Sequence, residues 1–309
     1  MNILPVISNF SDQMEVIYKD FHQHPEIGFE EVRTSQIVAK YLTDFGVDEV
    51  HTEIGVTGVV GVIRGKQAGN RRVGLRADMD ALPIQEETDL PYKSQSDGKM
   101  HACGHDAHTT MLLGAAKHLA ETRNFQGEVI VIFQPAEEGL GGAKAMIEDG
   151  LFDRFPCDEV YGMHNSPSGK PGTFEICRGA AMAGAAFFDI HVTGQGSHAA
   201  MPQNSKDAIQ ITNSLITDMN AIISRNVPPL DTCVLSITQV HAGSAYNVIP
   251  QTAHLCGTIR YFKDDIFNLV CDRMQSICKG VGTAYDAEVK LDIRHAFKVL
   301  ENNHDLSSA

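Results

Sequence analysis

Apolar and polar positions recur along the first 180 residues with two periods, one typical of helices and one of strands. Apolar residues three and four apart predict helices at about 8–23, 37–45 and 106–119. Short apolar runs bounded by Gly, Arg or Asp predict strands at 59–63, 73–75, 129–133 and 159–163. Because helices and strands alternate, we expect an α/β domain with a mostly parallel sheet and helices on both faces.

The pattern changes near Ala183. From there it predicts strands at 187–192, 233–240, 252–261 and 288–293, and helices at 207–224 and 264–281. This βαββαβ order is the ferredoxin-like arrangement. We therefore expect a first domain at 1–181, an inserted ferredoxin-like domain at 182–293, and a return to the first domain at 294–309.

Composition limits the classes of partner. The 309 residues, 43% of them hydrophobic and 21% charged, are typical of a globular protein with about two domains. Asp and Glu outnumber Lys and Arg by 39 to 25, and the net charge of -14 argues against nucleic acid and anionic membranes as partners. We find no signal-peptide pattern and no apolar run long enough to span a membrane. Seven cysteines without regular spacing favour a reducing compartment, so we expect a cytoplasmic protein.

The densest group of reactive side chains is the segment His101-Ala-Cys-Gly-His-Asp-Ala-His108. Only Gly104 separates Cys103 from His105, so a bend there can turn a thiolate and an imidazole toward one point. Both are ligand types for a borderline-soft ion such as zinc. A polar loop before a helix would explain one such pair, but two further segments point the same way.

Those segments are Gln134-Pro-Ala-Glu137-Glu138 and Gly162-Met-His164, and each follows a predicted buried strand. Open α/β sheets carry their chemistry at the carboxyl ends of strands. Adjacent carboxylates repel, so at a buried strand end they need a cation or a proton nearby. A pair of solvated glutamates stays open as the alternative.

Other polar residues carry weaker signals. Asp78 and Asp80 follow a predicted strand, where a chemical role and a simple turn or cap are equally open. His22 and His24 lie where a helix ends and are more typical of helix-end residues than of ligands. His198, in the glycine-rich loop 194–202, is a candidate for polarising a substrate.

Taken together, seven segments resemble a known family. The chain is similar to the hippurate hydrolase and N-acyl-amino-acid amidohydrolase branch of the dinuclear metallopeptidases, which also includes plant auxin-conjugate hydrolases and some carboxypeptidases. The segments occur in order over nearly the whole chain: Arg76-Ala-Asp-Met-Asp80, His101-Ala-Cys-Gly-His-Asp106, Gln134-Pro-Ala-Glu-Glu138, Gly162-Met-His164, Gly196-Ser-His-Ala-Ala200, Asn247-Val-Ile-Pro250 and Gly257-Thr-Ile-Arg260.

The resemblance implies two divalent ions, with a thiolate shared between them. Zinc, manganese, cobalt and nickel all suit such a mixed ligand set. Glu137 would be the general base for a water activated by the ions. The implied ligands are Cys103, His105, Glu138 and His164, and two carboxylates would lie behind them, Asp80, which orients a ligand, and Asp106.

The resemblance also implies a role for the inserted domain, which in relatives is a lid and a dimerisation surface. We therefore expect a homodimer in which His198 reaches the active site of the partner subunit and stabilises an oxyanion. Asn247 and Arg260 would hold a substrate carboxylate, for which the fork of arginine is well suited.

The implied reaction is hydrolysis of N-acyl amino acids, such as hippurate-like substrates, to a carboxylic acid and a free amino acid. A dipeptidase or aminopeptidase with the same metal pair is the alternative, and it would need a site for the free amine of the substrate. Relatives have a further metal-binding histidine near the C-terminus, and this chain stops at Ala309 before that segment. A catalytically impaired fragment that binds metal or dimerises is therefore a third hypothesis.

Overall fold

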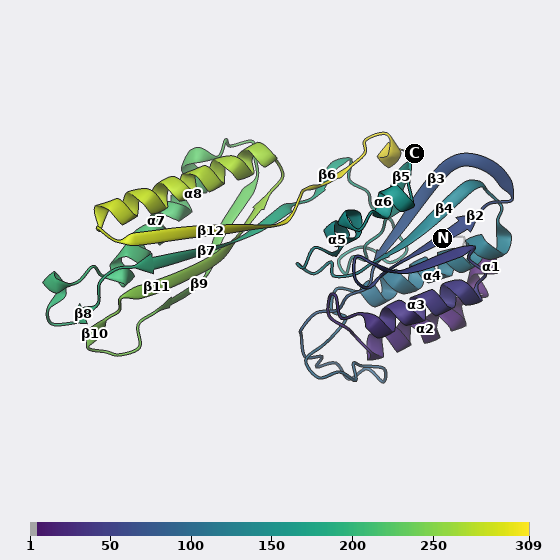
Figure 1. Cartoon of the computed structure of the whole chain (residues 1–309), viewed down its shortest axis with the longest axis horizontal. Helices are drawn as coiled ribbons and strands as arrows, with labels where there is room; N and C mark the ends of the chain where they lie inside the picture. Colours follow the sequence, from purple (N-terminus) through teal and green to yellow (C-terminus); the bar gives the residue numbers. More distant parts are fainter. Residues whose placement is uncertain (1–4, 309) are drawn as a thin grey trace. The chain divides into compact units, whose positions relative to one another are not determined.

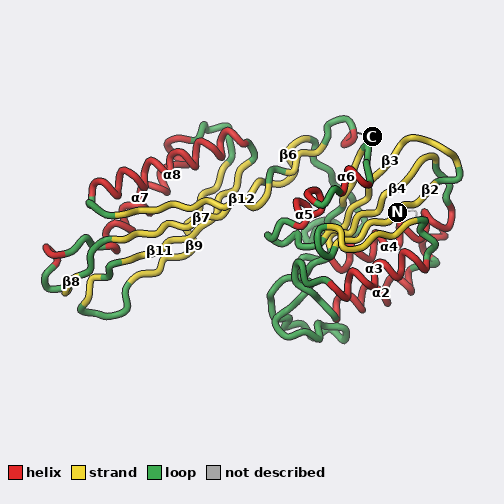
Figure 2. The backbone as a smooth tube through the Cα atoms, viewed as in Figure 1, coloured by secondary structure: helices red, strands yellow, loops and turns green. Residues whose placement is uncertain are grey.

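The computed structural model describes residues 5–308, which form two compact units, unit 1 (Met1–Thr173) and unit 2 (Phe174–Ala309). Figure 1 and Figure 2 show the elements of each unit. Assignment of residues 174–181 and 294–309 to the first domain stays a prediction. Within residues 5–308, no helix is both long and apolar enough to cross a membrane.

Unit 1 is built on a mixed five-stranded sheet in the order β1-β2-β4-β3-β5. β3 pairs in parallel with β4 and β5, whereas β2 pairs antiparallel with β1 and β4. The expectation of a mostly parallel sheet is wrong. The three-residue connection 55–57 permits only an antiparallel pair of β1 and β2, and β2 also runs antiparallel to β4. The strands are β1 (Glu49–Ile54), β2 (Gly58–Arg64), β3 (Gln67–Asp78), β4 (Gln126–Gln134) and β5 (Glu159–Gly162).

Helices cover both faces of this sheet, as the alternating pattern predicts. On one face, buried side chains of α2 (Ser11–Gln23), α3 (Val32–Asp44) and α4 (His105–Thr122) pack on Val131 and Phe133. On the other face, Met146 of α5 (Gly142–Glu148) and Leu151 of α6 (Leu151–Arg154) pack on Val60 and Ile132. Alternate residues of β4 thus serve two separate cores, which explains its continuous apolar run. A short helix α1 (Pro5–Ser8) precedes α2.

The carboxyl ends of three parallel strands meet at one edge of this sheet. Asp78, the last residue of β3, lies in register with Gln134, the last residue of β4, and β5 ends beside β3 at Gly162. The segments that leave these strands carry Asp80, residues 137–138 and His164. β5 itself is the outermost strand, and its Val160 and Tyr161 are 44% and 39% exposed.

Unit 2 is built on an antiparallel sheet in the order β12-β7-β11-β9, and helices α7 and α8 cover one face (Figure 1). Phe188, Ile190 and Val192 of β7 point into this core, so Asp189 and His191 point to the other face. The elements are β7 (Gly184–Thr193), α7 (Ala208–Asn226), β9 (Cys233–Ala242), β11 (Thr252–Tyr261), α8 (Asp264–Ala284) and β12 (Glu288–Phe297).

Two small strand pairs and two 3₁₀ turns complete unit 2. β6 (Gly179–Met182) pairs with β13 (Leu300–Asn302), and β8 (Ser197–His198) pairs with β10 (Val248–Ile249). The 3₁₀ turns are η1 (Pro202–Asn204) and η2 (Leu306–Ser308).

Candidate active site

Two of the candidate metal ligands lie where the loop after β3 joins helix α4. Cys103 ends this loop and His105 is the first residue of α4, with Gly104 between them at φ +94°. A side chain is strained at this backbone angle, and a Cβ on Gly104 would also come within 2.6 Å of the Asn165 side chain. Gly104 therefore makes the bend that brings Cys103 and His105 together.

Asp80 fixes the orientation of the His105 ring. Nδ1 of His105 donates to the backbone oxygen of Asp80 at 2.9 Å and lies 3.2 Å from its Oδ1. The other carboxylate oxygen of Asp80 accepts the backbone N–H of Glu138 at 2.9 Å. One carboxylate thus holds both the imidazole and the glutamate segment, and it leaves Nε2 of His105 free to bind something else.

Two ligand atoms are buried without a hydrogen-bond partner in the described chain, Nε2 of His105 and Oε1 of Glu138. They lie 3.9 Å apart, and Oε2 of Glu137 is also 3.9 Å from Nε2 of His105. Sγ of Cys103 lies 3.4 Å from Nε2 of His164. Ligand atoms of Cys103, His105 and His164 fall within 4.8 Å of one another, as do those of His105, Glu137 and Glu138.

This arrangement fits divalent ions. Buried polar atoms are nearly always paired, so two unpartnered ligand atoms 3.9 Å apart fit a cation bound between them. The donor set of one thiol, two imidazoles and carboxylates suits zinc and similar borderline ions. Three segments that are distant in sequence, residues 103–105, 137–138 and His164, are thus brought together.

The electrostatics of the site also favour a cation. Burial and the neighbouring Glu138 raise the pKa of the Cys103 thiol to about 12, so without a cation the thiol keeps its proton. Burial lowers the pKa of His105, but Asp80 and Asp78 outweigh it and raise the value to about 9. Burial likewise raises the pKa of Glu137; Asp78 and Glu138 add to this increase, and His105 partly offsets it.

Hydrogen bonds of His108, Asp78 and Asn165 surround the candidate ligands, and these contacts were not assigned from the sequence. Nδ1 of His108 donates to Asp78 at 2.6 Å, and its Nε2 accepts the backbone N–H of Asn165 at 3.0 Å. Asn165 in turn accepts Nδ1–H of His164 through its backbone oxygen at 2.7 Å. His105 and His108 are three residues apart on one helix face, and this spacing was the signal that could have revealed these contacts.

Asp106 lies in a separate buried network. Its carboxylate is 2.6 Å from Nδ1 of His22, and Nε2 of His22 is 3.3 Å from Glu86 in the loop after β3. Hydrogen bonding to Asp106 raises the pKa of His22. Asp106 therefore connects helices α2 and α4 to the loop that ends at Cys103, and His22 is more than a residue at a helix end.

Comparison with known proteins identifies the family. The sequence model of Peptidase family M20/M25/M40 matches residues 74–309, which is more than half of the chain. The chain belongs to this family. Among curated M20 relatives, the hippurate hydrolase of Campylobacter jejuni is 46% identical over 99% of this chain and 79% of its own length. The N-acetylcysteine deacetylase of Bacillus subtilis is 38% identical over 88% of this chain and 71% of its own.

Solved structures share the fold of this chain. A putative aminohydrolase from methicillin-resistant Staphylococcus aureus matches with a TM-score of 0.92 and 34% identity, over 98% of this chain and 80% of its own. A Bacillus subtilis protein described as a dinuclear metal binding peptidase of the M20 family matches with a TM-score of 0.81 and 32% identity, over 97% and 78%. The mixed α/β fold of this chain is therefore that of M20 peptidases.

The remaining candidate residues of this M20 chain lie in unit 2. His198 and Asn247 are neighbours, because β8 and β10 pair and Ala199 N–H donates to the backbone oxygen of Asn247 at 3.0 Å. Arg260 lies near the other end of β11, beside Thr258 and the ring of Phe187. Arg260 is eight positions after Thr252, where β11 begins, a span of about 27 Å along a strand. Unit 2 thus groups His198 with Asn247 but not with Arg260.

Proposed function

We propose that this M20-family chain is a metal-dependent amidohydrolase that cleaves N-acyl amino acids to a carboxylic acid and a free amino acid. The observation that carries the proposal is the pair of buried, unpartnered ligand atoms, Nε2 of His105 and Oε1 of Glu138, beside the Glu137 carboxylate. A buried site with open ligand atoms and an adjacent basic carboxylate is what hydrolysis by an activated water requires.

In this proposal Cys103, His105, Glu138 and His164 hold two divalent ions. Such ions, when bound, lower the pKa of water and polarise a carbonyl group. Their identity stays open among zinc, manganese, cobalt and nickel. Asp80 keeps His105 turned toward the site.

Glu137 acts as the general base. Its side chain is 36% exposed, so a substrate and water can reach it, and burial raises its pKa toward the range in which a carboxylate both takes and returns a proton. It accepts the proton of the attacking water and passes it to the leaving nitrogen. Glu138 is committed to a ligand role, which explains why two glutamates follow each other.

The substrate class rests on the names of relatives and on Arg260. Hippurate hydrolase and N-acetylcysteine deacetylase are both names for enzymes that release an amino acid from an acyl group. Arg260 and Asn247 would hold the free α-carboxylate of that amino acid. A dipeptidase remains the alternative, and so does a metal-binding chain with impaired catalysis.

Unit 2 is, in this proposal, a ferredoxin-like lid and dimerisation domain. The βαββαβ order and the strand order β12-β7-β11-β9 support the ferredoxin-like assignment. Because Arg260 lies about 27 Å along β11 from the end near Asn247, one carboxylate meets both residues only if two copies of the chain contribute. We propose a homodimer in which His198 and Asn247 serve the site of the partner subunit. A cytoplasmic location agrees with seven free cysteines.

Hydrolysis assays with matched substrates test the substrate class. Benzoylglycine and glycylglycine share the released glycine and differ in whether a free amine is present. After chelation, the protein is assayed with each ion added back, and we expect metal-dependent release of glycine from benzoylglycine only. Faster release from glycylglycine would favour the dipeptidase, and release from neither substrate would favour the impaired chain.

The substitution Glu137→Gln tests the mechanism. Gln keeps the shape but removes the base, so we expect metal content to be unchanged and kcat to fall at least about 10²-fold. Glu148→Gln, on the surface of α5, is the control and should behave as the parent. Retained turnover in Glu137→Gln would remove Glu137 from the mechanism.

A further inference from the structure

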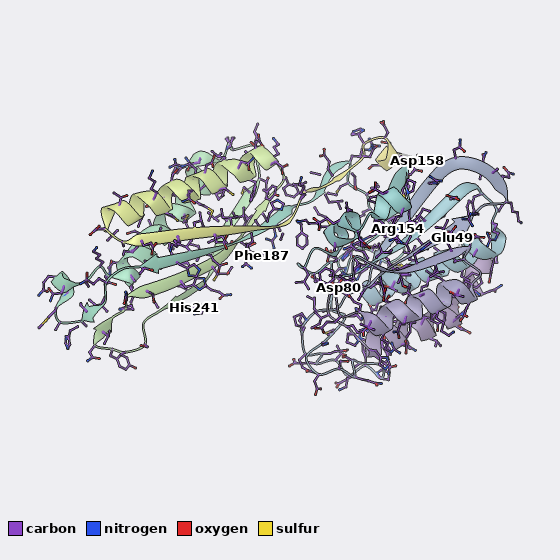
Figure 3. All side chains as sticks on the ribbon, in the orientation of Figure 1. Glu49, Asp80, Arg154, Asp158, Phe187 and His241 are labelled. Carbon is purple, nitrogen blue, oxygen red and sulfur yellow. The ribbon has the colours of Figure 1, made fainter. Side chains whose placement is uncertain are left out.

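Unit 2 carries a second group of metal-ligand side chains on the face of its sheet that the helices leave uncovered. Figure 3 labels His241 on the sheet of this unit, on the side away from α8. His254 of β11 lies in register with His191 of β7 on one side and His241 of β9 on the other. The next row along the strands pairs Cys256 with Asp189. Strand pairing thus places three imidazoles beside a thiol and a carboxylate.

Three of these side chains, those of Asp189, His254 and Cys256, are in direct contact with one another. Nε2 of His254 lies 2.8 Å from Oδ1 of Asp189 and 3.3 Å from Sγ of Cys256. Sγ of Cys256 lies 3.2 Å from the same Oδ1. Ligand-ion distances of about 2.0–2.3 Å put the ligands of one zinc ion roughly 3.3–3.7 Å apart, so small side-chain shifts suffice for all three to share an ion.

We propose that Asp189, His254 and Cys256 form a binding site for a borderline-soft divalent ion, separate from the cluster in unit 1. The donor set of one thiolate, one imidazole and one carboxylate is of the kind that Zn²⁺ and Co²⁺ accept. A water molecule takes the fourth position, because three protein ligands leave one tetrahedral corner open to solvent. This site does not depend on the hydrolase activity proposed above.

Neighbouring side chains fix the orientation of two of the three ligands, Asp189 and His254. Arg294 Nη2 donates to Oδ2 of Asp189 at 2.9 Å, which fixes the carboxylate and leaves Oδ1 directed at His254 and Cys256. The ring of His191 stacks on that of His254 with centroids 4.4 Å apart and the planes 1° from parallel. The rotation of His254 is therefore restricted, as that of a metal-bound imidazole usually is.

The site is also accessible. The side chains of His254 and Asp189 are 34% and 20% exposed. A hollow of about 440 Å³ lies beside His254 and is lined in part by His191 and His241. An ion and its water can therefore enter from solvent without unfolding the sheet.

Binding is a proton exchange with no redox step. Without an ion, the Cys256 thiol keeps its proton and donates it to Asp189. When the ion binds, the thiol proton leaves to solvent, a sulfur–metal bond forms, and the proton of His254 resides on Nδ1 so that Nε2 can bind. One proton is released for each ion taken up.

Cobalt titration of the full chain tests the proposal. The parent for the test is Cys103→Ser, because it removes the thiolate of the unit 1 cluster, and thiolate bound to Co²⁺ gives a charge-transfer absorption that oxygen and nitrogen ligands do not. We expect the final intensity of this band to correspond to about one thiolate-bound Co²⁺ per chain. The proton release of this site, about one per ion, is the difference between this parent and the same protein with Cys256→Ser, because the remaining ligands of unit 1 are present in both. Excess Zn²⁺, which has a filled d shell, should remove the band.

Three further variants show which residues give rise to the band. In Cys103→Ser/Cys256→Ser the band should vanish, whereas in Cys103→Ser/Cys177→Ser, which loses an exposed cysteine of the same unit, it should persist. His254→Gln in the Cys103→Ser parent should weaken Co²⁺ binding at least about tenfold. Absence of the band in the Cys103→Ser parent, or its survival without Cys256, overturns the proposal. Circular dichroism of each variant confirms that it is folded.

Discussion

At the scale of single residues, the candidate site depends on side chains held by partners far away in sequence. The sequence identified Cys103, His105, Glu137, Glu138 and His164 because each stands in a dense motif or directly after a buried strand. It did not identify the contacts of Asp78 with His108 or of His22 with Asp106, which join residues 30 and 84 positions apart. Motif density marks reactive side chains, but the partners that orient them are set by the tertiary fold.

Substitution of Gly104 tests the bend between Cys103 and His105. Gly104→Ala combines a left-handed backbone angle with a contact to Asn165 of 2.6 Å, so we expect a loss of about 1–3 kcal/mol in the free energy of unfolding and lower metal content. Gly98→Ala is the matched control: its φ is +70°, but a Cβ there meets nothing within 4 Å. If both variants lose equal stability in urea denaturation and both retain metal, the contact with Asn165 has no role.

At the scale of elements, the long loop between β3 and α4 is tied down by buried polar contacts. Glu86 accepts the backbone N–H of Ser94 at 2.6 Å and contacts His22, and the ring of Tyr92 packs edge-on against His22 with centroids 5.5 Å apart. The candidate ligand Cys103 lies at the end of this loop. His22 therefore acts as a positioning residue that holds the loop against α2 and α4.

The substitution His22→Gln should lower the free energy of unfolding by an amount that depends on pH. The pKa of His22 is raised, chiefly by its hydrogen bond to Asp106, so its stabilising effect is fully present below its unfolded value near 6.5. That effect is lost as pH rises through the raised pKa of the folded state. We expect His22→Gln to cost about 1–3 kcal/mol at pH 6 and less at high pH, measured by urea denaturation.

The His22→Gln experiment has a control variant and an outcome that would contradict it. His51→Gln, at a half-buried histidine of β1 that contacts Glu49, is the control and should lower the free energy of unfolding less than His22→Gln does at pH 6. A destabilisation by His22→Gln that grows as pH rises would contradict the assignment of a charged His22 between two carboxylates.

Most helices and strands of both units follow from hydrophobic periodicity, and the exceptions have a physical cause. β1 was not predicted, because Glu49–Ile54 contains mainly polar residues and only Ile54 is fully buried. The direction of β2 was also missed, since pairing direction depends on the lengths of connections and not on the strand itself. The pairs β6–β13 and β8–β10 are two to four residues long, too short for any period to emerge.

At the scale of the whole molecule, the proposed homodimer predicts that two inactive chains restore each other. His198→Ala and Arg260→Ala should each lose most turnover alone. In a mixed dimer, one of the two sites would combine an intact Arg260 with an intact His198 of the partner subunit, so a 1:1 mixture should recover about a quarter of the parent activity.

Two results of this mixing experiment would contradict the proposed dimer. The mixture is prepared by unfolding and refolding the two variants together, and light scattering reports whether dimers form. No recovery from a mixture that does contain dimers would mean that each chain uses its own His198, and a monomeric parent would refute the proposed dimer outright.

The position of β5 has a consequence for handling the protein. One side of this strand offers backbone amides and carbonyls without a neighbouring strand in the described sheet, and its Val160 is 44% exposed. Such an edge recruits strands from other chains, so concentrated samples should self-associate through it. The substitution Val160→Lys would oppose this association by charge repulsion. If Val160→Lys and the parent aggregate equally as concentration increases, the association takes place through other surfaces.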